Sequence, residues 1–222
     1  MGRRRVIITE TELRNMIQQA IRESYPGLLD NDNTGELNRE AYKKGFRYIA
    51  YHNTTNKDLT FFDVRTSGIH FGSEKAATQR GQIRDTQSTT NRYFLKIDNP
   101  YVIERDFDWE GEALTDNLMD DEEFQQWREE FDPSYYLSTK GFKEMEYDEN
   151  GQPAYARSIQ EMLADEGYDC IVYKNEQEDK GSYSVAMFNP NNIKLAQETY
   201  DDSGQPIPLN QRFDTNTDDV SY

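Results

Sequence analysis

The chain has 222 residues, of which 35% are hydrophobic and 30% charged, a length that fits one large domain with appendages or one domain plus a small partner element. Its 42 acidic and 25 basic residues give a formal net charge of -17, and such a surface repels phosphate backbones, which argues against nucleic-acid binding. No apolar run is long enough to span a membrane. The apolar stretch at residues 6–8 is too short for the core of a signal peptide, so we expect a protein of a cytoplasm that is not secreted by a signal peptide.

Residues 1–27 are predicted to form a basic, amphipathic helical leader. Thr9 and Glu12 have the spacing of a capping box, and Pro26-Gly27 ends the helix. Apolar residues follow the cap at helical spacing on one face: Leu13, Met16, Ile17, Ala20 and Ile21. Two interpretations stay open, an ordinary packing helix or a docking segment that places its apolar stripe on a partner protein.

The domain at residues 28–197 begins with Asp30-Asn31-Asp32-Asn33-Thr34-Gly35, which is similar to the start of a calcium loop. Ala41 stands where the twelfth loop position needs a bidentate Glu, so we predict a polar linker and no metal site. Further along the chain we expect helices at residues 37–47, from 73 onward and at 154–166, and an acidic helical insert at 106–152. Strands are expected at 46–52, 68–72, 93–97, 101–103, 170–173, 183–188 and 193–195, with a polar, mobile segment at 82–91 and an extended or only partly ordered tail at 198–222.

Both histidines of the chain, His52 and His70, lie in the stretch 51–80. His52 ends a segment with apolar residues at every second position, and His70 lies in a short apolar run bounded by glycines. Both patterns are typical of strands. Two imidazoles at strand ends with a polar loop between them suggest a binding site, although two structural histidines would give the same pattern.

An ordered set of short motifs runs through the domain. They are Tyr51-His52-Asn53-Thr54, Gly68-Ile69-His70-Phe71-Gly72-Ser73, Asn99-Pro100, Gly167-Tyr168-Asp169-Cys170-Ile171-Val172-Tyr173, Glu176-Gln177-Glu178 and Phe188-Asn189-Pro190-Asn191-Asn192-Ile193-Lys194. From about residue 46 to 195, this order resembles the ADP-ribosyltransferase domains of phage and mobile-element polyvalent proteins. The resemblance implies an α+β fold with a split β-sheet core, flanking helices and a cleft for NAD between the two sheets. Such a fold needs no glycine-rich dinucleotide loop, and the chain has no G-x-G-x-x-G motif.

The resemblance also implies roles for individual residues. Glu178 would be the catalytic carboxylate, because cleavage of the nicotinamide–ribose bond passes through an oxocarbenium-like state that a negative charge stabilises. Glu176 would orient an arginine acceptor, because a Glu-x-Glu pair is the pattern of arginine-modifying transferases. His52 would bind the NAD ribose, His70 would stack on or hydrogen-bond near the nicotinamide, and both count among the catalytic residues. The NAD-binding set is completed by Asn53, Thr54, Phe71 and Ser73, with no metal.

Two positions depart from the family pattern. Asn53 and Cys170 stand where glycines are usual. A glycine at the first position lets the backbone approach the nicotinamide closely, and Asn tolerates unusual dihedral angles better than most residues. Cys170 is expected to pack as a small buried residue and not to act as a catalytic thiol.

The function that the resemblance implies is that of a phage-associated, toxin-like mono-ADP-ribosyltransferase, a glycosyltransferase that moves ADP-ribose from NAD to a host protein, with arginine as the suggested acceptor. It would act in the host cytoplasm, or be packaged in a virion with residues 1–27 docked on a capsid or other virion protein. Two alternatives stay open. One is a virion or mobile-element structural protein with a catalytically degenerate fold, which the two departures favour, and the other is an NAD glycohydrolase.

Overall fold

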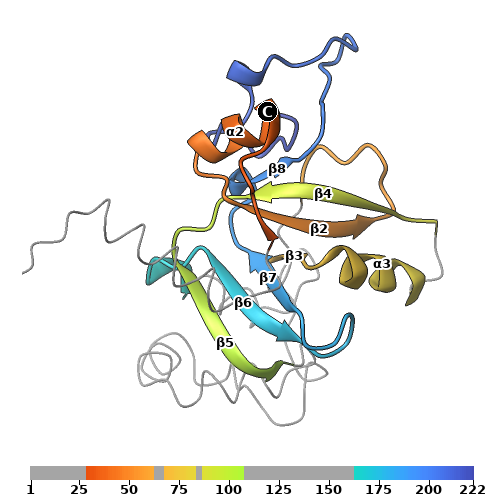
Figure 1. Ribbon diagram of the computed structural model, residues 1–222, viewed down its shortest axis with the longest axis vertical. Coiled ribbons are helices and arrows are strands. Elements are labelled where there is room, and N and C mark those ends of the chain that lie inside the picture. Colours follow the sequence, from red (N-terminus) through yellow and green to blue (C-terminus); the bar gives the residue numbers. More distant parts are fainter. Residues whose placement is uncertain (1–28, 63–67, 84–86, 108–162) are drawn as a thin grey trace, which may run out of the picture.

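The computed structural model describes residues 29–62, 68–83, 87–107 and 163–222 (Figure 1). The predicted leader helix and nearly all of the predicted acidic insert therefore lie outside the described residues. Within them, the chain forms two four-stranded sheets. In Figure 1 the strands β2 and β4 cross above β5, β6 and β7 of the other sheet.

The first sheet has the strand order β1-β2-β4-β8. Its strands are β1 (Leu29–Asp30), β2 (Tyr48–Thr54), β4 (Thr89–Leu95) and β8 (Ile193–Leu195), and every neighbouring pair is antiparallel. The second sheet has the order β3-β7-β6-β5. Its strands are β3 (Ile69–Phe71), β7 (Tyr183–Met187), β6 (Cys170–Asn175) and β5 (Pro100–Phe107), of which β5 and β6 are parallel.

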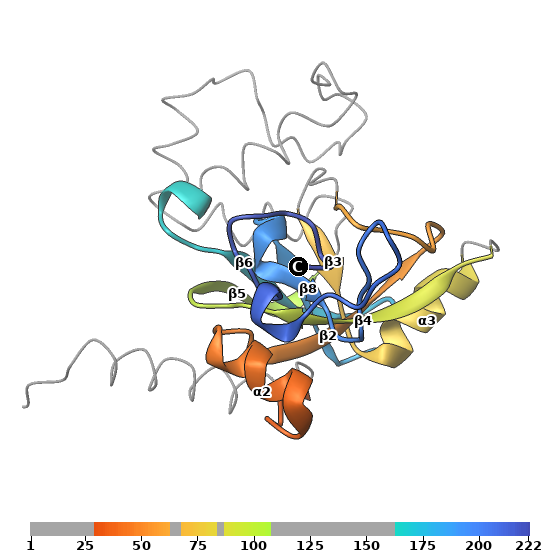
Figure 2. The same cartoon turned by 90° about the horizontal axis from the view of Figure 1, so that it is seen from above.

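Two α-helices accompany the sheets in the described part of the chain. The helix α2 (Gly35–Lys43) leads into the start of β2, and α3 (Glu74–Ile83) follows β3 and packs against β2 and β4 (Figure 2). Two short 3-10 helices, η2 (Pro190–Asn192) and η3 (Leu209–Gln211), lie near the C-terminus. This mixture of split sheets and helices confirms the predicted α+β class.

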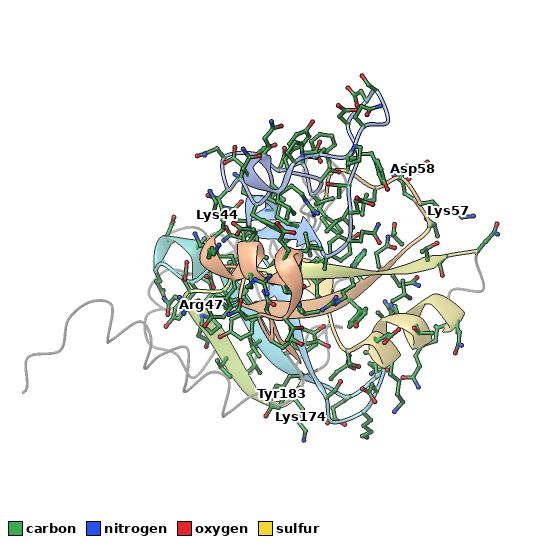
Figure 3. The ribbon with its side chains drawn as sticks, turned by 45° about the horizontal axis from the view of Figure 1, so that its top comes forward. Lys44, Arg47, Lys57, Asp58, Lys174 and Tyr183 are labelled. Atoms are coloured by element: carbon green, nitrogen blue, oxygen red, sulfur yellow. The ribbon has the colours of Figure 1, made fainter. Side chains whose placement is uncertain are left out.

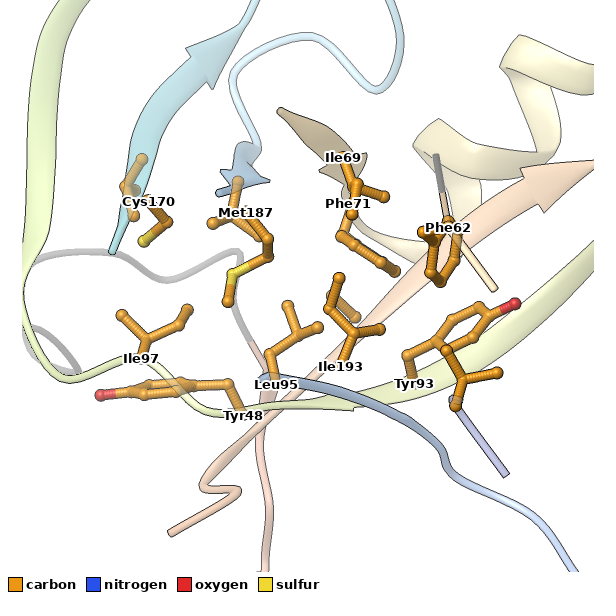
Figure 4. Close-up of a cluster of buried hydrophobic side chains, with 14 of the residues drawn as sticks. Tyr48, Phe62, Ile69, Phe71, Tyr93, Leu95, Ile97, Cys170, Met187 and Ile193 are labelled. Carbon is orange, nitrogen blue, oxygen red and sulfur yellow. The ribbon is translucent and has the colours of Figure 1, made fainter. Parts of the chain in front are cut away.

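The main hydrophobic core lies between the two sheets (Figure 4). Alternate residues of each strand contribute to it, as the two-residue period of a strand requires. The sheets supply Tyr48, Ala50, Tyr93, Leu95, Ile193 and Leu195 on one side and Ile69, Phe71, Cys170, Val172, Val185 and Met187 on the other. The next residue of the β2 series after Ala50 is His52, so the sequence pattern directs this imidazole toward the same core.

A pair of backbone hydrogen bonds joins the two sheets beside this core. The amide of Tyr51 donates to the carbonyl of Gly72 at 2.9 Å, and the amide of Gly72 donates back to Tyr51 at 3.0 Å. Gly72 lies just after β3, so the end of β3 is fixed next to the second half of β2. This contact sets the distance between the two histidine-bearing strands.

The C-terminal segment, residues 198–222, corrects the prediction of partial order. It is irregular but packed, because Val220 enters the main core and Phe213 a second core with Phe46 and Phe94. Arg212 is only 2% exposed, and its guanidinium donates to the carbonyls of Gln197 and Leu195 at 2.6 and 2.7 Å. The segment has few periodic apolar residues, which is why its sequence resembles that of a mobile tail.

Other boundaries differ from the prediction more modestly. The helix α3 continues to Ile83 and β4 begins at Thr89, so much of the segment predicted to be mobile is regular structure. The strand β5 runs to Phe107, two residues into the predicted insert. The helix expected at 154–166 is described only from residue 163, where 163–165 are helical and Gly167 follows with a φ of 90°.

Candidate functional site

The imidazole of His52 lies in an aromatic cluster between the sheets. Its ring centroid lies 5.2 Å from that of Phe62 in an edge-on arrangement, 5.5 Å from that of Phe71 and 6.5 Å from that of Tyr93. Its Nδ1 lies 2.7 Å from the carbonyl oxygen of His70. A carbonyl can only accept, so Nδ1 carries the hydrogen and Nε2 is the acceptor of the neutral ring. The strand β3 thus fixes both the tautomer and the orientation of His52.

The imidazole of His70 lies on the other face of β3. Ile69 and Phe71 on either side of it point into the main core, whereas its Nδ1 lies 3.0 Å from the hydroxyl of Tyr173 on β6. Burial, with smaller effects from the charges of His52 and Arg80, lowers the pKa of His70 to about 3. The ring is therefore neutral at physiological pH.

The two histidines predicted to form one site are linked, but not ring to ring. The side chain of His52 reaches the backbone of His70, while the side chain of His70 points away toward β6. The alternation of side chains along β3 is the physical reason, because a residue between two core residues must face the opposite side.

Glu178 lies in the turn at residues 176–182, between β6 and β7, and faces α3. Its Oε1 lies 3.1 Å from Nη1 of Arg80, and its side chain is 12% exposed. The backbone amide of Glu178 donates to Oδ1 of Asn175 at 2.9 Å. The carboxylate predicted to be catalytic is therefore held by a cation from α3.

Glu176 lies in the same turn but pairs with lysines. Lys180 Nζ lies 3.1 Å and Lys174 Nζ 3.6 Å from its carboxylate oxygens. Lys174 pairs with Tyr183 in the last register step of β6 and β7, and Figure 3 shows both residues together at this end of the sheet. The Glu176 carboxylate thus binds cations already, and the 77% exposed Lys180 is the more readily displaced of the two.

Ser73 and Asp179 join the turn to the start of α3. The Ser73 hydroxyl donates to Oδ2 of Asp179 at 2.6 Å, and Lys75 Nζ lies 2.5 Å from Oδ1. These hydrogen bonds, led by that from Lys75, hold the pKa of the Asp179 carboxyl below its usual range. Sequence reasoning selected Ser73 but missed Asp179, Arg80 and Tyr173. The only sequence signal for Asp179 was its place directly after Glu178.

The remaining residues of the predicted NAD-binding set have structural contacts. Asn53 is buried against α3, where its Nδ2 donates to Oγ1 of Thr90 at 3.0 Å and a Cβ on Gly81 would come within 2.5 Å of it. Thr54 accepts a hydrogen bond from the amide of Asn56 at 3.1 Å. Phe71 is a core residue beside His52. Asn53 thus fills a space that the small Gly81 leaves open.

Cys170 is fully buried in the main core. Burial, followed by the charge of Asp169, raises the pKa of its thiol well above the usual range. A nucleophilic thiolate is disfavoured in these surroundings, which agrees with the prediction of a packing role. Among the described residues no group of His, Cys, Asp or Glu could hold a metal ion, and none of their helices is long and apolar enough to cross a membrane.

One of three comparisons with known proteins gives a match. A search of curated proteins and a search of solved structures found no match. A family model described as ADP-ribosyltransferase in polyvalent proteins matches residues 43–203. That range includes both sheets apart from β1, the two histidines and the turn with both glutamates, and it is well over half of the chain. The chain therefore belongs to the ADP-ribosyltransferase family of polyvalent proteins.

Proposed function

We propose that the protein is a mono-ADP-ribosyltransferase that transfers ADP-ribose from NAD to a protein. The observation that carries the proposal is the family match together with the setting of Glu178, a mostly buried carboxylate that Arg80 of α3 holds in place. Departure of nicotinamide leaves positive charge on the ribose ring, and a fixed carboxylate stabilises that charge more strongly than mobile water does. Glu178 supplies this carboxylate.

His52 is proposed to position the NAD ribose. The hydrogen bond from its Nδ1 to the carbonyl of His70 fixes the ring, and a ring held in one orientation can align the ribose beside it. The aromatic side chains of Phe62 and Phe71 beside it offer surfaces against which a flat nicotinamide or adenine ring can pack. Such fixed groups lower the entropic cost of bringing the reacting atoms together.

The proposed acceptor residue is arginine, which Glu176 would receive. Glu176 already pairs with two lysines through side-chain contacts at 3.1 and 3.6 Å. A guanidinium matches a carboxylate with two parallel hydrogen bonds, which an ammonium cannot do, so an acceptor arginine can replace Lys180 at this carboxylate. A phage or virion setting with a host protein as acceptor, and docking on a virion protein through residues 1–27, belong to the same proposal.

A catalytically degenerate fold is the second candidate. It is favoured by the packing of Asn53 against Gly81 and by the full burial of Cys170, because both departures from the family pattern serve structure. An NAD glycohydrolase differs from the first proposal only in that water replaces the acceptor. Turnover of NAD separates the degenerate fold from the two enzymes, and labelling of protein separates the enzymes from each other.

The test uses NAD labelled in its adenylate part, a bacterial lysate as the source of acceptors, and wild type beside Glu178→Gln. The variant keeps the size of the side chain, and we expect it to reduce transfer a few hundred-fold, since loss of one preorganised group costs on the order of 3 kcal/mol. Asp202→Asn, a charge change on an exposed residue of the C-terminal segment, is the matched control. Nicotinamide release without labelled protein would indicate a glycohydrolase, and no turnover of NAD by the wild type would leave the degenerate fold.

A further inference from the structure

Hydrogen bonds to the side chain of Asn175 hold the start of the turn at residues 176–182. Asn175 precedes it and is only 6% exposed. Its Oδ1 accepts hydrogen bonds from the amides of Gln177 and Glu178 at 3.0 and 2.9 Å, while its Nδ2 donates to Oγ of Ser184 at 3.1 Å. Hydrogen bonds within the turn fix its shape, but they do not fix its position relative to α3.

Asp179 connects this rigid turn to α3 through both its side chain and its backbone. The carboxylate accepts hydrogen bonds from Ser73 and Lys75 at 2.6 and 2.5 Å. The amide of Asp179 donates to Oε1 of Gln79 at 2.6 Å. Three contacts from one residue thus reach three residues of the segment 73–79, about a hundred positions earlier in the sequence.

Two further observations concern the backbone conformation of Asp179 and the way its contact with Ser73 is linked to the start of α3. Asp179 has a φ of 44°, in the left-handed region, a conformation that is uncommon for residues with a side chain, although Asp adopts it more readily than most. The Ser73 hydroxyl that donates to Asp179 also accepts a hydrogen bond from the backbone amide of Ala76, with 3.0 Å between N and Oγ. The start of α3 and the turn therefore share one hydroxyl group.

The geometry points to Asp179 as the positioning residue of the candidate active site: its carboxylate, held by Ser73 and Lys75, fixes the turn on α3 and thereby fixes Glu178. Glu178 is the residue directly before it and touches the same helix through Arg80. Without the Asp179 carboxylate, the described contacts that still attach the turn to α3 are the exposed Arg80 and the hydrogen bond from the Asp179 amide to Gln79. This inference rests on the proposed function only for its effect on catalysis, since the attachment itself can be measured without any activity.

The first measurement is therefore amide hydrogen exchange over residues 176–182. Asp179→Ala should increase exchange of this segment while the melting temperature and the exchange of β6 change little. Ser73→Ala should increase exchange of the segment too, and it should also lower the melting temperature, because the same hydroxyl caps the start of α3. Asp202→Asn serves as the control for loss of one carboxylate charge. Unchanged exchange of the turn in both variants would overturn the inference, whatever the activity of the protein.

The second measurement separates a positioning role from a purely structural one. If Asp179 acts through Glu178, Asp179→Ala should lower kcat for nicotinamide release 10- to 100-fold with a smaller change in KM for NAD, because displacement of a catalytic group by about 1 Å costs up to a hundred-fold. Asp179→Asn keeps an oxygen for Ser73 and should retain more activity. The double variant with Lys75→Ala should be no worse than Asp179→Ala alone, because Lys75 reaches the turn through the same carboxylate.

The outcomes distinguish this inference from the proposed function. Faster exchange with an unchanged kcat would overturn the positioning role and leave the transferase intact. No NAD turnover by the wild type would overturn the proposed function, and the exchange experiment alone would then decide whether Asp179 holds the turn. If Asp179→Ala fails to fold, Lys75→Ala removes a contact of the same carboxylate from a side chain that is 67% exposed, and it should show the same two effects to a smaller degree.

Discussion

Arg212 offers the sharpest test of how the C-terminal segment stabilises the fold. Its guanidinium is almost fully buried and donates one hydrogen bond each to the carbonyls of Gln197 and Leu195, while its Cζ lies 5.0 Å from the ring centroid of Phe213. Arg212→Ala removes both donors and leaves the buried carbonyl oxygen of Leu195 and the partly buried one of Gln197 without them. Each hydrogen bond from a charged donor contributes about 1.5–3 kcal/mol, so we expect a loss of about 3–5 kcal/mol in the free energy of unfolding.

The assay is urea unfolding of the full chain, followed by circular dichroism and by the fluorescence of its tyrosines, of which Tyr48 and Tyr93 lie in the main core. Arg212→Lys should lose less than Arg212→Ala, because one ammonium can still reach one of the two carbonyls. Arg39→Ala, on the exposed surface of α2, is the matched control and should stay within about 0.5 kcal/mol of wild type. A loss below about 1 kcal/mol for Arg212→Ala, or one equal to the control, would refute an integral role of the segment 198–222.

Three further predictions concern the site and the helix next to it. In the unfolded chain His70 binds a proton near pH 6.5, whereas in the folded protein its pKa is about 3, so the free energy of unfolding decreases as the pH falls below 6.5. Between pH 7.5 and 5 this group should lower the free energy of unfolding by about 2 kcal/mol. His70→Gln should make the pH-dependent decrease in stability smaller by that amount. Gly81→Ala should destabilise by about 1–3 kcal/mol because the new Cβ meets the side chains of Asn53 and Ser88. Adding Asn53→Gly should restore part of the loss, exposed Thr78→Ala in the same helix should cost little, and a neutral Gly81→Ala would contradict this packing. Nitrogen NMR should find the neutral His52 protonated on Nδ1, as its hydrogen bond to the carbonyl of His70 requires; the Nε2-protonated form would contradict the proposed orientation.

Much of the strand pattern could be read from local sequence. The alternation before His52, the glycine-bounded run around His70 and the apolar run from Cys170 each correspond to a strand of the structure. These segments are predictable because their apolar residues face one continuous core, which imposes a period of two on the sequence. The C-terminal segment has no such period, because single side chains such as Phe213 and Val220 anchor it. Its sequence therefore predicts an extended or only partly ordered tail, although the segment is packed.

The candidate site was also predictable from the sequence only in part. The sequence by itself determined which residue types are available, two histidines on neighbouring strands and two glutamates in one turn, and the family that their order resembles. Only the tertiary structure decided that the ring of His52 meets the backbone of His70, that Arg80 holds Glu178, and that Asp179 joins the turn to α3. The physical reason is that these contacts link residues 18 to 106 positions apart, and their geometry depends on the packing of two sheets and a helix, which no local pattern encodes.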